Sequence, residues 1–324
     1  VLTGVHEFES GSIHMNGENK DIINHSPQEA QANGISTVYQ EVNLCPNLTV
    51  AENLFIGREP RNKVGMINWK EMNARSAKLL ESLNINVPPT QMLDECSVAI
   101  QQMIAIARAV DMKCKVLILD EPTSFLDVKH KLELLAILEK MAREKKMTVI
   151  MSLHEIDLAQ KVSDKIVCVQ GENISHFGKP EEVFQEEIIR DLYGITNGSF
   201  DPRFGSIELP GIKGEPEVLV ISSGGSGIPV YRKLRKERIP FAAGILYEND
   251  IDCELARQLA VEVITEKAFE EISDETFASA EKMIERCGRV IDAGVQIGTY
   301  NRRIGELLEQ AERLGKLERA GTLK

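Results

Sequence analysis

A run of four apolar residues, Val116 to Leu119, ends directly in two carboxylates, Asp120 and Glu121. An uninterrupted apolar run of this length is typical of a strand that is buried on both faces, as in a parallel sheet. Ligands of open α/β sheets bind beyond the carboxyl ends of the strands, so a ligand site is expected at these two carboxylates. Paired carboxylates there suit a magnesium ion and an attacking water, which together form half of a phosphate-handling site.

Strand-like and helical segments alternate around this run. Residues 35–39 and 147–153 read as two more short buried strands, and residues 131–146 as a helix between strands. Apolar residues recur at spacings of three and four over 51–55, 69–83 and 98–110, which predicts a helical subdomain at about 45–110. The alternation predicts a parallel α/β sheet within a first domain of residues 1–200.

The second half of the chain predicts a separate domain. Residues 164–178 read as a hairpin with Gly171 near its turn, and Pro180 should open one acidic helix that reaches Tyr193. Glycine and proline are dense in the next segment, and a linker is predicted at 201–214. Four strand-like runs, VLVIS, FAAGILY, VEVIT and RVIDAG, then alternate with helical segments, which predicts a small Rossmann-like α/β domain over 215–324.

Charge and hydropathy narrow the possible partners. A net charge of −12 and a pI near 5.2 repel phosphate backbones, so no nucleic-acid partner is expected. The apolar runs are far shorter than the roughly 18 residues of a membrane span, so a membrane role would come through a partner protein. The six cysteines lie singly without a C-x-x-C pair, which favours reduced thiols over a metal site.

Four polar residues follow the predicted strands in chain order: Gln40, the pair Asp120 and Glu121, and His154. A magnesium-nucleotide hydrolase needs such a set: an amide for the metal and water, one carboxylate for magnesium, another to polarise the water, and an imidazole that senses the γ-phosphate. Taken singly, each residue has a plainer reading as a loop amide, a capping histidine or a solvated strand end. Their order together with the string DEPTSFLD favours the hydrolase.

Over residues 1–200 the chain resembles the ATP-binding subunits of ABC transporters. By this resemblance, STVYQE carries the Q-loop glutamine Gln40, and LILDE is the Walker B strand with magnesium-linked Asp120 and catalytic Glu121. SFLD would be the D-loop with Asp127, and SLHE would carry the switch histidine His154. The fold that the resemblance implies is a P-loop NTPase-like ABC ATPase core.

The same resemblance implies cofactors and partners. ATP and Mg²⁺ would be the cofactors, with Gln40 and Asp120 as the metal ligands. The partners would be membrane permease subunits, a second ATPase subunit in a head-to-tail dimer and, indirectly, a solute-binding protein. The protein would then lie peripherally on the cytoplasmic face of the cell membrane.

Two elements of the family pattern are missing or changed. No G-x-x-x-x-G-K-[ST] string, the P-loop that cradles phosphates, occurs in the sequence, so the family would place it upstream of Val1 in a longer, untruncated form. ATPase activity of the isolated chain is therefore not expected. Where the family reads LSGGQ, residues 96–100 read CSVAI, which keeps Ser97, a nucleotide contact by the resemblance, but loses both glycines and the glutamine.

The likeness also changes along the chain. Up to about residue 120, the altered signature and QEVNLCPNLTVAENLFIGREP resemble importers of ribose, xylose and galactose. From about 120 to 324 the chain is similar to iron-siderophore and cobalamin importer ATPases that carry a C-terminal extension. A mosaic gene is the resulting interpretation, with one divergent lineage as the alternative. Sugar is the expected cargo, and iron-siderophore or cobalamin is the next.

The C-terminal domain offers a second candidate site. Gly224, Gly225 and Gly227 follow a predicted strand, and the helix start beyond them could accept an anion or a nucleotide, although G-x-G-x-x-G is incomplete. Glu248 stands where a dinucleotide fold places a ribose-binding acid. A tight turn without a ligand is the alternative. If this loop binds a ligand, the whole protein could instead be a non-hydrolytic, regulatory ligand-binding protein.

Overall fold

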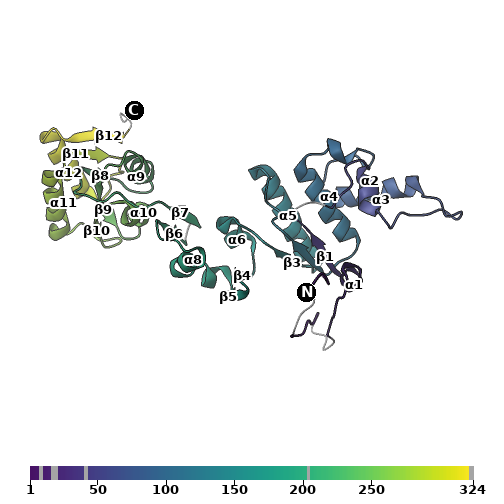
Figure 1. The fold of residues 1–324 in the computed structure, drawn as a ribbon. Coiled ribbons are helices and arrows are strands. Elements are labelled where there is room, and N and C mark those ends of the chain that lie inside the picture. The colour runs from purple at the N-terminus through teal and green to yellow at the C-terminus, as the bar shows by residue number, and fades with distance from the viewer. Residues whose placement is uncertain (7–9, 16–20, 40–42, 203–204, 321–324) are drawn as a thin grey trace. The chain divides into compact units, whose positions relative to one another are not determined.

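The computed structural model describes residues 1–6, 10–15, 21–39, 43–202 and 205–320. The chain divides into two compact units, residues 1–164 and 165–324 (Figure 1). The contacts thus divide the chain earlier than the predicted linker at 201–214. Part of that predicted linker forms an antiparallel hairpin of two short strands, β6 (Ser199–Asp201) and β7 (Ser206–Glu208).

The first unit is built on a three-stranded parallel sheet in the order β1-β2-β3. Its register pairs Val38 with Leu119 and Leu119 with Met151, so the three strands end in one row. The elements in chain order are α1 (Pro27–Ala32), β1 (Ile35–Val38), α2 (Val50–Phe55), α3 (Trp69–Ser82), a 3-10 turn (Leu93–Glu95), α4 (Val98–Asp111), β2 (Val116–Leu119), α5 (Val128–Glu144), β3 (Thr148–Met151) and α6 (Ile156–Val162).

Side-chain caps start the main helices of this unit. Thr49 and Glu52 form a reciprocal capping box at α2, and Ser97 and Asp127 cap α4 and α5. The three helices predicted between 45 and 110 are present within a residue or so of the expected bounds. Their apolar faces join the strands in one core, which confirms that the periodicity marks buried faces.

Burial in the small sheet varies with the position of the strand. Leu117 and Leu119 of the central strand β2 are buried, whereas Val116 and Ile118 on its other face are half-buried, so the apolar run is not buried on both faces as expected. Among the described residues, the outer strands β1 and β3 each pair only with β2. Tyr39, which follows β1, and Ile150 of β3 are 42% and 44% exposed.

The second unit begins with a hairpin and two short helices. β4 (Ile166–Gln170) and β5 (Asn173–Gly178) pair antiparallel around Gly171, as predicted. The single helix predicted from Pro180 to Tyr193 is two helices, α7 (Pro180–Val183) and α8 (Glu186–Tyr193). The chain leaves helical geometry at Phe184, whose side chain is buried, so packing of this ring accounts for the break.

A five-stranded parallel sheet forms the rest of this unit, in the order β10-β9-β8-β11-β12. Val218 and Val220 of β8 pack with α9 and α10, while Leu219 and Ile221 face α11 and α12, so helices cover both faces of the sheet (Figure 1). The elements are β8 (Val218–Ile221), α9 (Gly227–Lys236), β9 (Phe241–Tyr247), α10 (Ile251–Leu259), β10 (Glu262–Glu266), α11 (Asp274–Arg286), β11 (Arg289–Asp292), α12 (Arg302–Arg313) and β12 (Leu317–Arg319).

Candidate functional site

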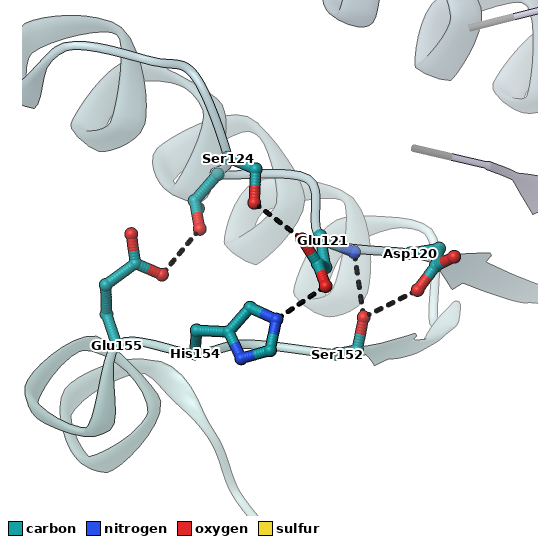
Figure 2. A network of polar contacts seen from close by, with 7 residues as sticks. Asp120, Glu121, Ser124, Ser152, His154 and Glu155 are labelled. Carbon is teal, nitrogen blue, oxygen red and sulfur yellow. Dashed lines mark hydrogen bonds and ion pairs between the residues drawn. The ribbon is translucent and has the colours of Figure 1, made fainter. Parts of the chain in front are cut away.

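The ends of β2 and β3 bring the predicted acidic pair next to the predicted histidine. Because Leu119 and Met151 are register partners, the residues that follow them leave the sheet side by side. His154 Nε2 lies 2.5 Å from Glu121 Oε1, and Glu121 Oε2 accepts a hydrogen bond of 3.0 Å from Ser124 Oγ (Figure 2). Both oxygens of the Glu121 carboxylate are therefore engaged.

Ser152 links the two carboxylates. Its hydroxyl donates to Asp120 Oδ1 at 2.9 Å and accepts from the Glu121 backbone N–H at 2.8 Å (Figure 2). Sequence reasoning missed this residue. The signal was its position as the first residue after the apolar run of β3, directly across from Asp120.

Glu121 has a left-handed backbone, with φ of +44°. This region is uncommon for a residue with a side chain, and such conformations gather at functional sites when the surroundings hold them. The hydrogen bond from its N–H to Ser152 and the contacts of its carboxylate supply that support. Glu121 is thus fixed from both its backbone and its side chain.

The charges of this pair reinforce one another. The hydrogen bond from His154 lowers the pKa of the Glu121 carboxyl, with a further contribution from Ser124. The same contact raises the pKa of the His154 imidazole above its ordinary value. Each shift favours the charged form of its group, and the His154 side chain, which is 74% exposed, is open to other partners.

A second layer holds the loop that carries Glu121. The Glu155 carboxylate accepts from Thr123 Oγ1 at 2.9 Å and pairs with Lys131 Nζ at 2.5 Å. Lys131 lowers the pKa of Glu155, which stays charged, and Thr123 is buried. These contacts tie the loop after β2 to the start of α6, next to His154.

The other predicted residues take different positions. Ser97 accepts from the backbone N–H of Ile100, and Asp127 accepts from that of His130, so both serve as helix N-caps. Their roles as nucleotide contacts stay predictions. Gln40 lies outside the described residues, so its contact with the metal is likewise a prediction.

Gly224 and Gly225 lie in the loop between β8 and α9, and Gly227 is the first residue of α9. The Gly224 N–H donates to both oxygens of Asp250 at 3.0 Å, and the Gly227 N–H donates to the Asp252 carboxylate at 3.0 Å. Gly224 and Gly225 have positive φ, as a tight turn requires. Two of the amides that were expected to face an anion are therefore already paired with acidic side chains.

A magnesium ion would find one suitable carboxylate here. Asp120 is exposed at the strand end, and Figure 2 shows its second oxygen without a contact among the residues drawn. Mg²⁺ is usually held by one or two carboxylates together with phosphates and waters, so Asp120 fits that role. In the described part of the chain, no group of three or more His, Cys, Asp or Glu side chains could hold a metal without such help.

Two sequence families match this chain. The family described as ABC transporter covers residues 1–124, and the MJ0874 family covers residues 241–317. The second match falls within the five-stranded domain, which therefore has relatives of its own.

Individual relatives extend this picture. The galactofuranose transporter ATP-binding protein YtfR of Escherichia coli is 40% identical over 194 residues, which are 60% of this chain and 38% of that protein. The chain thus spans well under half the length of that relative. The solved structure of cbiO1 from Clostridium perfringens, part of the ABC transporter complex cbiONQ, shares 27% identity over 63% of this chain and 78% of that one, with a TM-score of 0.48.

A relative from Methanocaldococcus jannaschii covers more of the chain. The ABC transporter ATP-binding protein MJ0873, itself uncharacterised, is 34% identical over 242 residues, which are 73% of this chain and 81% of that protein. A match over 73% of the chain necessarily includes the stretch from Asp120 to His154, which forms the network at the strand ends. The chain therefore belongs to the ABC transporter ATP-binding proteins.

Proposed function

We propose that this chain is the ATP-hydrolysing subunit of an ABC importer, with Glu121 as the residue that polarises the attacking water. The network of Asp120, Glu121, Ser152 and His154 at one sheet edge carries the proposal. In it a carboxylate held by backbone and side-chain contacts stands between a candidate magnesium ligand and an imidazole. These are among the groups that hydrolysis of a phosphoanhydride by water requires, the phosphate cradle being the other.

In this proposal, the site is at rest while Glu121 is paired with His154. A carboxylate whose pKa is lowered by an imidazolium is a weak base, so Glu121 is poorly suited to take a proton while the pair persists. A γ-phosphate is an anion that competes for the exposed imidazolium of His154. In this proposal, the turn of His154 toward phosphate releases Glu121 Oε1 for water.

Asp120 and Gln40 are the proposed magnesium ligands. When bound, Mg²⁺ would neutralise charge that develops on the phosphate oxygens. Ser152 holds one Asp120 oxygen through a hydroxyl donor and thereby orients the other. Because no P-loop string occurs in these 324 residues, binding of ATP to this chain is expected to be weak.

The proposed cargo is a sugar. Support comes from relatives whose names state galactofuranose, ribose or fructose transport. Iron-siderophore or cobalamin is the second candidate. The proposed partners are permease subunits and a second ATPase subunit at the cytoplasmic face of the membrane. In the described residues, no helix is long and apolar enough to cross a bilayer.

The mosaic interpretation and the single divergent lineage stay alternatives. The match to MJ0873 extends over 73% of this chain and so crosses residue 120, where the two likenesses are expected to join. Because both likenesses are to members of one family, a relative that aligns across this position is expected of either history.

Titration of the full chain with ATP by calorimetry, with and without magnesium, tests the proposed function. Asp120→Asn should weaken magnesium-dependent binding at least about tenfold, which is about 1.4 kcal/mol. Glu121→Gln should keep binding and lower any turnover by about 10²- to 10⁴-fold, the usual contribution of a general base. Glu139→Gln removes an exposed carboxylate of α5 and should change neither quantity.

Two results would contradict the proposal. One is a folded chain that shows no magnesium-dependent ATP binding at millimolar nucleotide. The other is binding that Asp120→Asn and Glu139→Gln change to the same extent.

A further inference from the structure

The second unit contains a cavity of about 530 Å³ that the ATPase function does not use. Its walls come from the loops that follow β8, β9, β10 and β11, at the carboxyl ends of the parallel strands. Strands β9 and β10, which follow β8 in the sequence, lie on one side of β8 in the sheet. The next strand, β11, pairs with β8 on its other side. Ligands of open α/β sheets bind where the strand order reverses in this way, and the volume suits a small molecule.

Aromatic rings stand at the rim of this cavity. Phe269 and Tyr300 are 78% and 56% exposed, and Tyr247 is half-buried beside them. Phe269 also has φ of +65°, a conformation that side chains rarely adopt. The Tyr247 hydroxyl donates to the Glu270 carbonyl at 3.1 Å and so holds the turn that carries Phe269. A solvent-exposed ring kept in a strained turn is available to stack on a flat ligand.

The charge of the lining excludes one class of ligand. Asp250 is the one charged side chain among the residues that line the cavity, and none of them is a lysine or arginine. The amides of Gly224 and Gly227 already bind carboxylates. A phosphate would therefore meet a negative charge and find few free donors, so the ligand is uncharged or cationic. This differs from the anion that the glycine pattern led us to expect.

Polar groups in the lining suit the edges of a heterocycle. The side-chain amides of Asn249 and Gln296 face no hydrogen-bond partner in the part of the chain that is described. Each offers both a donor and an acceptor, as the edge of a nucleobase does. Asp250 Oδ2 accepts a single hydrogen bond, from Gly224, and can accept another from a sugar hydroxyl.

We propose that the C-terminal domain binds a nucleoside, without phosphate, in this cavity, with the base against Phe269 and Tyr300. The aromatic rim recognises the ring, the two amides recognise its edge, and Asp250 recognises a hydroxyl. The site lies within the second unit and shares no residue with the Asp120–His154 network. The protein would therefore bind a small molecule at a site separate from the proposed ATPase site.

Saturation-transfer NMR and calorimetry on the full chain test this proposal, with adenosine, guanosine, cytidine and AMP as the probes. At least one nucleoside should bind, and Phe269→Ala should weaken it roughly 5- to 150-fold, the range for loss of one base-stacking aromatic ring. Tyr300→Ala should also weaken it. AMP should bind at least about tenfold more weakly than adenosine, because its phosphate meets Asp250.

Matched variants separate this site from the rest of the protein. Phe177→Ala removes a ring from β5 whose exposure, 66%, lies between those of Phe269 and Tyr300, and it should leave nucleoside affinity unchanged. Glu121→Gln should also leave it unchanged, so failure of the ATPase proposal and failure of this one are distinguishable. The proposal is overturned if no nucleoside binds at about 5 mM, if Phe269→Ala and Tyr300→Ala both bind as well as the wild type, or if AMP binds more tightly than adenosine.

Discussion

Replacement of Ser152 by alanine tests whether this hydroxyl organises the acidic pair. The change removes the 2.9 Å bond to Asp120 Oδ1 and the 2.8 Å bond from the Glu121 N–H. A hydrogen bond contributes about 0.5–1.5 kcal/mol net, and at this exposed edge water replaces part of what is lost. We expect the two bonds together to contribute about 1 kcal/mol to the free energy of unfolding of the first unit. For a unit of this size, that lowers Tm by about 2–4 °C.

Tryptophan fluorescence can report this change selectively. Trp69 is the single tryptophan of the chain and opens α3 in the first unit. Denaturant titration should show a lower midpoint for Ser152→Ala with an unchanged slope. Ser152→Thr keeps the hydroxyl and should retain most of the stability. Ser82→Ala removes an exposed hydroxyl that donates only within its own helix, to Leu79, and should have little effect.

The comparison between Ser152→Ala and Ser82→Ala decides the question. If both variants change the free energy of unfolding by the same amount, within about 0.5 kcal/mol, then Ser152 does not organise the strand ends. A shift confined to Ser152→Ala, restored by threonine, would mean that the hydroxyl itself holds the left-handed backbone of Glu121.

Two further predictions concern the same unit. Because His154 has a raised pKa and Glu121 a lowered one, their pairing should stabilise the fold fully between their ordinary values of about 4.5 and 6.5. It should fade as pH rises through the pKa of His154 and as pH falls through that of Glu121. NMR titration of His154 should show a lower pKa in Glu121→Gln, and an unchanged pKa would refute the pairing. Leu117→Ala, in the centre of β2, should cost about 2–5 kcal/mol by leaving a cavity, whereas a loss below about 1 kcal/mol would contradict the packing.

Local pattern was sufficient to predict the strands and helices that frame the candidate site. Burial of one side of an element requires apolar residues at regular positions along it. The apolar run of β2 and the apolar spacing of α3 and α4 therefore reveal these elements in the sequence. The meeting of Glu121 with His154 followed from the rule that parallel strands end at one edge. Its detail did not, because a contact between residues 33 positions apart depends on register.

The misses have related causes. Ser152 is a common residue in a common place, and only its pairing across from Asp120 shows its role. The break between α7 and α8 depends on the burial of Phe184, which local propensity does not encode. The paired state of the Gly224 amide was hidden because its partner, Asp250, lies 26 residues away on the next loop.

Both candidate sites lie at the carboxyl ends of parallel strands and both contain carboxylates, but only the first also has a basic side chain. In the first unit, an exposed imidazole with a raised pKa provides a positive group for an anionic phosphate. In the second unit, the lining has a carboxylate and no basic residue, and its loop amides are already bound to acids. A triphosphate should therefore favour the first unit and an uncharged nucleoside the second, because electrostatics separates ligands that share a base. Such a division would allow one chain to respond to a nucleoside without losing its nucleotide site to it.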